Sequence, residues 1–448
     1  MLEGREIKVE INDINHDGEG VGRDDGRVVF VPGTVPGELV SVRLTEVRNN
    51  YARGIPLEII SPSRNRQAPL CSVASKCGGC RLQHITYEEQ LRLKTGLVRQ
   101  NITRIGGADG SLVKPIIGMA DPWHYRNNVR FKVRRRNGRV LLGFYEQESH
   151  RLAIIDGNEE EPCLLAHREL NEVAMSARRL MEENSGRHQD IPEEIQLRRG
   201  SSGEIMVILI AEPGKNSSLI SLAEGLISIP GVISVIEYKR PADKKGYGRY
   251  KRLAGTEFIV DEINGLKFKI SAGSFYQVNP VQTAVLYQIA LDYCNLQGQE
   301  ELADAYCGVG TITLYAARKS AMVRGYEVVT GAVQDARVNA ELNGIKNASF
   351  YEGPAEKVLP QHIAKGFKPS VIVLDPPRSG CRPKVLEAAA NSGARRIVYI
   401  SCDPATLARD VRRLSELGYE PLEVQPVDMF PHTAHVECVV LMTNVNNK

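Results

Sequence analysis

Apolar and polar residues alternate with a period of two in parts of the first 60 residues, which predicts short strands. Residues 6–11 (EIKVEI) and 39–44 (LVSVRL) follow this pattern. Turn residues separate the runs, in the glycine-rich stretch 18–23 (GEGVGR) and around Pro32-Gly33 and Pro36-Gly37. Regular strand spacing with such turns predicts a small all-β barrel over about residues 1–60.

The pattern changes toward the carboxyl terminus, where strand-like and helix-like segments alternate. Residues 371–374 (VIVL) and 397–400 (IVYI) are continuous apolar runs, as in buried strands of a parallel sheet. Asn279 and Pro280 predict the cap and first residue of a helix over 281–296. Such alternation predicts a doubly wound α/β domain over about residues 271–448. Residues 61–270 are predicted to form a mixed α/β central domain, with an amphipathic helix over 87–105.

Cys402 lies where the predicted strand 397–400 meets a predicted helix. Asp403 can cap that helix, Pro404 fits its first position and Gly418 ends it. Ligands of open α/β sheets bind at the carboxyl ends of the strands, and the positive end of a helix dipole favours a thiolate there. We therefore expect Cys402 to be a nucleophile near neutral pH. The alternative is a buried, inert cysteine that behaves as a small apolar residue.

Other candidate residues also follow predicted strands. Residues 306–310 (YCGVG) form a glycine turn in which a ligand can approach the backbone. Glu327 follows the next strand at nearly the distance expected of an acid that binds ribose hydroxyls. Asp375 ends the strand 371–374, and Glu437 lies where a polar loop enters a strand. By propensity alone, a lone glutamate such as Glu437 is more often a surface residue.

Three of the nine cysteines, Cys71, Cys77 and Cys80, fall within ten residues with the spacing C-x5-C-x2-C. Cys163 is a fourth candidate in a polar loop. In a reducing compartment this grouping favours metal binding or catalysis over disulfides, and four thiolates suit zinc or an iron–sulfur cluster. Zinc ribbons usually bring two CxxC pairs, so the single pair here favours iron–sulfur.

Charge and composition restrict the partners. The net charge is only +3, so a nucleic-acid site has to be a local patch. Residues 123–132 (WHYRNNVRFK) interleave aromatic and cationic side chains, which suits stacking on unpaired RNA bases and contact with phosphates. A solvated charged face is the alternative. The chain shows neither a signal-peptide core nor an apolar run that could span a membrane, so we expect a cytoplasmic protein with no membrane partner, monomeric by default.

Together these stretches resemble a known family. Residues 18–23 (GEGVGR) and 28–38 (VVFVPGTVPGE) resemble the TRAM domain, an RNA-binding barrel. The motifs SFYQVNP, DAYCGVGT, LDPPRSG, SCDPATLARD and DMFPHTAHVE resemble, in this order, the S-adenosylmethionine-dependent RNA (uracil-5-)methyltransferases. The cysteine spacing resembles the iron–sulfur branch that modifies 23S ribosomal RNA. The strand 322–326 is more polar than the family pattern, and Pro354 stands where a polar residue is common.

The resemblance implies a Rossmann-like methyltransferase domain and roles for ten residues. A 4Fe–4S cluster would be bound by Cys71, Cys77, Cys80 and Cys163. The S-adenosylmethionine pocket would be formed by Gln277, Tyr306, Glu327 and Asp375. Cys402 would be the nucleophile and Glu437 the base. This fits the chemistry, because carbon 5 of uracil is a poor nucleophile until a thiolate has added at carbon 6.

Three alternatives remain open at this stage. The RNA could be transfer RNA, since both substrates share these motifs. The sequence DPPR also resembles the motif of amino-group methyltransferases, which need no cysteine. A redox-sensing RNA-binding protein without methyl transfer is the third reading, and it leaves Cys402 and Glu437 unexplained.

Overall fold

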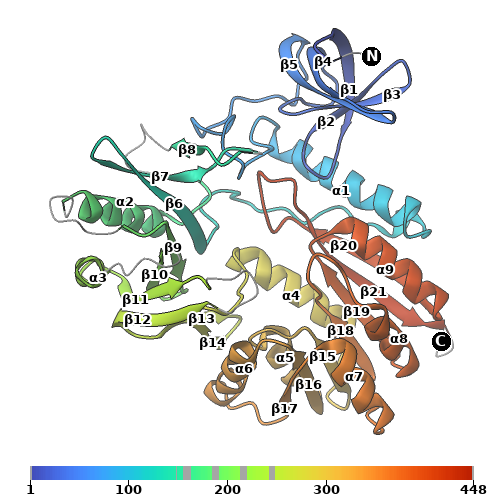
Figure 1. The fold of residues 1–448 in the computed structure, drawn as a ribbon. Coiled ribbons are helices and arrows are strands. Elements are labelled where there is room, and N and C mark those ends of the chain that lie inside the picture. Colours follow the sequence, from blue (N-terminus) through green and yellow to red (C-terminus); the bar gives the residue numbers. More distant parts are fainter. Residues whose placement is uncertain are drawn as a thin grey trace.

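The computed structural model describes residues 3–147, 149–154, 163–183, 191–211, 219–241 and 248–445. Within these ranges the strands form a closed barrel, a two-stranded sheet and two seven-stranded sheets. In Figure 1 the barrel is blue, the first seven-stranded sheet runs from teal to green, and the second runs from brown to red.

The predicted amino-terminal barrel is confirmed. Its strand order is β1-β2-β3-β5-β4. The strands are β1 (Glu6–Ile14), β2 (Gly20–Asp24), β3 (Arg27–Val31), β4 (Leu39–Val47) and β5 (Tyr51–Ser61). Alternate residues such as Val9, Ile11 and Val40 are fully buried, so the period-two pattern fills the barrel interior. Gly22 lets two strands approach closely, because a β-carbon there would lie 2.2 Å from Val9 Cγ1.

The central sheet has the order β12-β11-β10-β9-β6-β7-β8. Its strands are β6 (Asn128–Arg136), β7 (Arg139–Tyr145), β8 (Leu152–Ile154), β9 (Glu194–Arg199), β10 (Ile205–Ala211), β11 (Val232–Lys239) and β12 (Arg249–Gly255). Helices α2 (Arg168–Glu183) and α3 (Ile220–Leu226) share an apolar core with one face of it. Val129, Phe131 and Val133 of β6 point into that core. Arg130 and Arg134 are exposed and Lys132 is half-buried, so the predicted alternation of β6 is confirmed.

The carboxyl-terminal sheet has the order β17-β16-β15-β18-β19-β21-β20. Its strands are β15 (Glu301–Ala305), β16 (Met322–Glu327), β17 (Ala348–Glu352), β18 (Val371–Leu374), β19 (Arg396–Ser401), β20 (Tyr419–Val427) and β21 (Glu437–Asn444). Strands β15 to β19 pair in parallel, and β21 lies antiparallel between β19 and β20. The α/β fold expected from the sequence is therefore confirmed, and the more polar stretch 322–326 is a strand within it.

Helices cover both faces of this sheet, as the continuous apolar runs predict. They are α4 (Pro280–Cys294), α5 (Thr311–Ala317), α6 (Thr330–Leu342), α7 (Ala355–Ala364), α8 (Pro383–Asn391) and α9 (Pro404–Glu416). Val371 and Val373 pack in the core that includes α4, α5 and α6. Ile372 and Leu374 pack in the core that includes α7, α8 and α9.

Three segments that precede residue 271 also pack against the carboxyl-terminal sheet or its helices. Helix α1 (Tyr87–Arg104), which confirms the helix expected over 87–105, places Val98 and Ile102 in the core beside α9. The short helix η1 (Gly110–Leu112) lies against β20. The hairpin β13 (Phe258–Ile263) and β14 (Leu266–Ser271) joins the core beside α4 and α6. The domain boundary expected at residue 270 stays a prediction. Among the described helices, none is both long enough and apolar enough to cross a membrane.

Candidate active site

Cys402 lies at the junction between β19 and α9. The Asp403 side chain accepts hydrogen bonds from the backbone N–H groups of Ala405 (3.0 Å) and Thr406 (2.8 Å) and so caps α9, as expected from the sequence. Pro404 is the first residue of the helix. The Cys402 side chain is partly exposed, whereas Tyr399 and Ile400 just before it are fully buried. The strand is therefore fixed in the core, while the thiol remains accessible.

Glu437 faces Cys402 across the sheet. Ser401 of β19 pairs with Cys438 of the antiparallel strand β21. The next position along β19 and the preceding position along β21 are Cys402 and Glu437, which therefore lie opposite each other. Glu437 is only 5% exposed. Its pKa is raised well above the usual value, chiefly by burial and further by the Asp375 carboxylate, while Arg378 opposes the shift.

The surroundings of Cys402 contradict one expectation. A thiolate near neutral pH was predicted from the helix dipole alone. Instead, burial raises the pKa of Cys402 to about 11, with further increases from Glu437 and Asp375 and a decrease from the Arg378 cation. The effect of the local dipole on the pKa is outweighed by burial of the thiol, to which two carboxyl groups from distant parts of the chain add. In the free protein the sulfur is therefore protonated near neutral pH.

Two aspartates lie near each other at the ends of the paired strands β15 and β18, with Asp304 fully buried and Asp375 partly buried. Asp375 follows β18, and burial raises its pKa to about 7. Asp304 of β15 is fully buried, and its Oδ2 accepts a hydrogen bond of 2.5 Å from the Thr313 hydroxyl. Burial raises the pKa of Asp304 to about 7 as well, and the Asp375 carboxylate contributes. Sequence reasoning missed Asp304, although its place just before the turn YCGVG could have indicated it.

Glu327 contacts the glycine turn between β15 and α5. Its Oε2 accepts a hydrogen bond of 3.1 Å from the Gly308 N–H, and its Oε1 accepts one of 2.8 Å from the Val329 N–H. Tyr306 opens the turn with a positive φ of 68°. A β-carbon at Gly308 would meet nothing within 4 Å, so the backbone of the turn is open on that side. This arrangement leaves room for a ligand on the open side of Gly308, near the Glu327 carboxylate.

Gln277 lies in the segment that enters α4. Gln277 is 9% exposed. The carbonyl of the adjacent Val278 accepts a backbone hydrogen bond of 2.9 Å from the N–H of Asn127, at the start of the central sheet. Asn279 caps α4 by accepting a hydrogen bond of 3.2 Å from the Gln282 N–H. The same Asn279 side chain donates to the Met429 carbonyl at 3.0 Å, which ties this segment to the loop before Glu437.

Helix α1 holds the loop 428–436 that leads into Glu437. Lys94 donates to Asp428 at 2.6 Å and to the Phe430 carbonyl at 3.1 Å. His432 donates its backbone N–H to the Gln90 side chain at 3.1 Å. The Trp123 ring stacks on the His432 ring with the centroids 3.8 Å apart. These positioning contacts join segments more than 300 residues apart, and no sequence periodicity indicates them.

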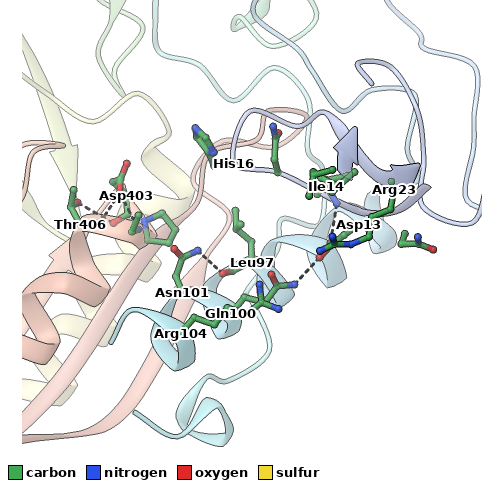
Figure 2. Close-up of a pocket in the computed structure, with 17 residues that line it drawn as sticks. Asp13, Ile14, His16, Arg23, Leu97, Gln100, Asn101, Arg104, Asp403 and Thr406 are labelled. Atoms are coloured by element: carbon green, nitrogen blue, oxygen red, sulfur yellow. Dashed lines mark hydrogen bonds between the residues drawn. The ribbon is translucent and has the colours of Figure 1, made fainter. Parts of the chain in front are cut away.

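A cleft lies between the barrel, α1 and the start of α9. It has a volume of about 660 Å³. Figure 2 shows that Asp13, Arg23, Gln100 and Arg104 reach it from the barrel and α1, while Asp403 and Thr406 reach it from the residues just after Cys402. The Gln100 amide donates to Asp13 at 2.7 Å and so bridges the helix and the barrel.

The four cysteines predicted to bind a metal lie close enough to affect one another electrostatically. Burial, followed by the proximity of Cys163, raises the pKa of Cys80 to about 12. The pKa of Cys77 is also raised, by burial and then by Cys163 and Cys71. However, within the described residues no three His, Cys, Asp or Glu side chains converge tightly enough to hold one metal ion. A ready-made single-ion site is therefore not present in this part of the chain.

Comparison with known proteins adds to this geometry. Residues 1–57 match the TRAM domain, and residues 250–445 match the family described as tRNA (uracil-5-)-methyltransferase. An uncharacterized RNA methyltransferase of Halalkalibacterium halodurans is 42% identical over 447 residues, which cover 97% of this chain and 96% of that protein. An uncharacterized RNA methyltransferase of Clostridium acetobutylicum is 39% identical, and the match covers 100% of this chain and 98% of that protein.

A solved structure is also similar over nearly the full length. It is the Pyrococcus abyssi tRNA (uracil-54, C5)-methyltransferase in complex with S-adenosyl-L-homocysteine, with a TM-score of 0.76 and 26% identity. The match covers 97% of this chain and 99% of that one. The fold and the relatives define an RNA methyltransferase. Within this class, the chain belongs to the tRNA (uracil-5-)-methyltransferase family and carries a TRAM domain at its amino end.

Proposed function

We propose that this protein transfers a methyl group from S-adenosylmethionine to carbon 5 of a uridine in RNA. The observation that carries the proposal is the opposed pair Cys402 and Glu437 at the ligand edge of the sheet, with the partly buried Asp375 near them. A nucleophile and a base facing each other are what this chemistry needs. An amino-group methyltransferase would use neither residue.

The reaction begins with the Cys402 sulfur, which adds to carbon 6 of the uracil and converts the ring into an enolate. S-adenosylmethionine, when bound, supplies an electrophilic methyl group, which carbon 5 of the enolate takes up. The Glu437 carboxylate then removes the proton from carbon 5, and elimination of the Cys402 sulfur restores the ring. Because burial holds the Cys402 pKa at about 11, the thiol has to lose its proton as the uracil binds, and the neighbouring Asp375 carboxylate can accept that proton. Arg378 favours that loss, since its charge lowers this pKa.

The methyl donor would lie between the glycine turn 306–310 and the segment around Gln277. The open side of Gly308 gives the donor space, and the Glu327 carboxylate can accept from ribose hydroxyls in place of its present backbone partners. Tyr306 and Asp375 flank the same edge. The target base would have to leave its stack to reach Cys402.

For the RNA itself we keep two candidates. The resemblance of the cysteine spacing favours 23S ribosomal RNA as the substrate. The Pyrococcus abyssi relative is a transfer RNA enzyme, and this favours transfer RNA as the second candidate.

A 4Fe–4S cluster bound by Cys71, Cys77, Cys80 and Cys163 fits the donor set. A cluster of four irons separates its thiolates more widely than one ion does, which suits thiols that interact electrostatically without converging on one point. Arg126, whose buried Nε lacks a hydrogen-bond partner, supplies a positive charge near Cys163 and Cys80. Analysis of iron and sulfide after anaerobic purification tests this. Cys80→Ser should lose the iron and Cys294→Ser should keep it; zinc or no metal in the wild type would refute the cluster.

The function is tested with RNA that contains 5-fluorouridine. Fluorine at carbon 5 cannot leave as a cation, so the covalent adduct should accumulate and shift the protein band on a denaturing gel. The adduct should form with wild type and be absent with Cys402→Ala, and Glu437→Gln should retain it because the base acts later. The band should be mapped first with 23S ribosomal RNA and then with transfer RNA. No adduct with either RNA, in protein that binds the methyl donor, would refute the mechanism.

A further inference from the structure

One face of the central sheet is only partly covered. The face that carries Val129 packs on α2 and α3, whereas Arg130 lies on the opposite face. Register places Arg130 opposite Gln196, Gln196 opposite Ile208, and Ile208 beside Ile236. Ile208 and Ile236 are covered by the hairpin β13–β14, since they share a core with Ile259. Further along the same face, at the margin of this core, lie the aromatic side chains of β11 and β12.

Those aromatic side chains are Tyr238 and Tyr250, which pair across the two strands. Their ring centroids are 4.6 Å apart and the ring planes differ by 32°. The backbone of Gly273 closes on the Tyr250 ring, because a β-carbon there would lie 2.9 Å from Cε2. Gly248 packs on the Tyr238 ring in the same way, because a β-carbon there would lie 2.2 Å from Cε2 of Tyr238. The Tyr250 ring is thus fixed in place, yet the residue is 49% exposed.

Cations lie in the same row of the sheet as these rings, because Tyr238 is beside Ile210 and Ile210 is opposite Glu194. Glu194, 3% exposed, accepts hydrogen bonds from Arg130, Lys132 (2.6 Å) and Arg240, and Arg240 also bonds to Glu193 at 2.7 Å. The three cations and two carboxylates leave this group, which we call the Glu194 cluster, with a net charge of +1. Arg130 and Arg198 are close enough to Tyr250 to lower the pKa of its hydroxyl, although burial and Tyr238 raise it more.

The same surface is joined to the segment that enters the candidate active site. Arg198 of β9 donates to the carbonyls of Ser271 (3.1 Å) and Ser274 (2.8 Å). Gly273, which packs on Tyr250, lies between these two residues, and Gln277 follows three residues after Ser274. Figure 1 shows β11 and β12 beside the hairpin β13–β14, on the side of the central sheet that faces the start of α4.

We propose that Tyr250 is a stacking site for an unpaired base of the RNA, with the Glu194 cluster binding an adjoining phosphate. An exposed ring that is already immobile loses little conformational freedom when a base stacks on it, and nearby cations neutralise the backbone that follows the base. The identity of the ligand as RNA rests on the proposed function. The site lies outside the TRAM barrel, and it adds Tyr250 of β12 to the RNA contact expected over residues 123–132.

The test measures binding separately from methylation. The probe is a short fluorescein-labelled oligouridylate, and its affinity is followed by fluorescence anisotropy without methyl donor. Tyr250→Ala should weaken binding by about tenfold or more, the usual effect of removing one stacking ring. Tyr250→Phe keeps the ring and should bind within about twofold of wild type. Phe258→Ala is the matched control, because it removes another exposed ring, which contacts Lys269 instead of the Glu194 cluster.

The outcomes separate the two proposals. Equal affinity of Tyr250→Ala and wild type, with thermal midpoints that also agree, would overturn the stacking site, as would a wild type that does not bind the oligouridylate. If wild type forms no 5-methyluridine while Tyr250→Ala still loses affinity and Tyr250→Phe does not, the methyltransferase proposal fails and the stacking site stands. Loss of affinity in Phe258→Ala to the same extent would also contradict a specific role for Tyr250.

Discussion

Lys94 of α1 and Asp428, just after β20, form an ion pair of 2.6 Å in which the two side chains are 1% and 0% exposed. Burial lowers the pKa of Lys94, while Asp428 opposes that shift. The Tyr87 hydroxyl donates to the same carboxylate at 2.9 Å. Because the pair lies at the start of the loop that leads into Glu437, it connects the stability of α1 to the candidate active site.

Removing one partner of this pair should destabilise the folded protein. Lys94→Met leaves the Asp428 charge buried without its cation, and we expect the free energy of unfolding to fall by about 3–5 kcal/mol. Urea unfolding followed by circular dichroism measures this. Lys114→Met is the matched control, since its pair with Glu423 (3.3 Å) has side chains 49% and 34% exposed and should contribute less than about 1 kcal/mol. Equal losses in the two variants would contradict this account.

The reactivity of Cys402 should depend on Arg378. Replacing the cation in Arg378→Gln removes an interaction that lowers the Cys402 pKa, so less thiolate is present at pH 8. If the Cys402 pKa rises by half a unit, alkylation by iodoacetamide should be about threefold slower. The rate is measured on the Cys402 peptide by mass spectrometry. In wild type the rate should keep rising with pH toward about 11. Arg382→Gln, an exposed arginine of the same loop, should leave the rate unchanged.

Asp304 should make the protein less stable as the pH rises. Its pKa is about 7 in the folded protein and 3.8 as the ordinary value, so the folded state holds the proton more tightly. Its contribution to stability is fully present below pH 3.8 and is lost as the pH rises toward 7. Asp304→Asn cannot ionise. Relative to wild type, it should gain a few kcal/mol in unfolding free energy between pH 5 and pH 8, because one pKa unit is worth about 1.4 kcal/mol.

The control for this pH effect is Asp292→Asn, on an exposed position of α4. The difference in unfolding free energy between Asp292→Asn and wild type should be the same at pH 5 and at pH 8. A difference for Asp304→Asn that does not change with pH would show that Asp304 is already ionised in the folded protein at pH 5.

Replacing two glycines of the carboxyl-terminal domain by alanine should change the stability of the protein in opposite directions. A β-carbon at Gly325 in β16 would lie 2.8 Å from the Cys307 sulfur and 2.9 Å from the Phe350 ring, both buried. Gly325→Ala should therefore cost about 1–3 kcal/mol through overpacking. At Gly331 in α6 a β-carbon meets nothing within 4 Å, so Gly331→Ala should stabilise the helix by about 0.5–1 kcal/mol. Thermal unfolding of both variants gives the two signs, and matching signs would contradict the prediction.

Local patterns in the sequence predicted the elements well. The stretch IVYISCDP is followed by a capped helix because Asp403 and Pro404 act on their nearest neighbours, and the structure contains both the strand and the cap. The barrel is likewise predicted by residue alternation, and the covered sheet by continuous apolar runs. The placement of Cys402 at a strand end also follows from these local signals.

Contacts between distant segments of the chain could not be predicted from such local patterns. That Glu437 faces Cys402 depends on β21 inserting antiparallel beside β19, which the alternation within either strand does not indicate. The expected thiolate was wrong for the same reason: the pKa of Cys402 is raised chiefly by burial in the folded domain and further by Glu437 and Asp375, which belong to two other segments. Lys94 and Asp428 are 334 positions apart, and neither residue alone indicates burial.

The place of β21 in the sheet also affects how the carboxyl-terminal domain folds. This strand is the last along the described chain, yet it pairs between β19 and β20 and begins with Glu437. Until β21 is in place, β19 therefore has an open edge, and Glu437 is absent from its position opposite Cys402. The pairing that closes the sheet is thus the same event that assembles the candidate active site, so the two form together.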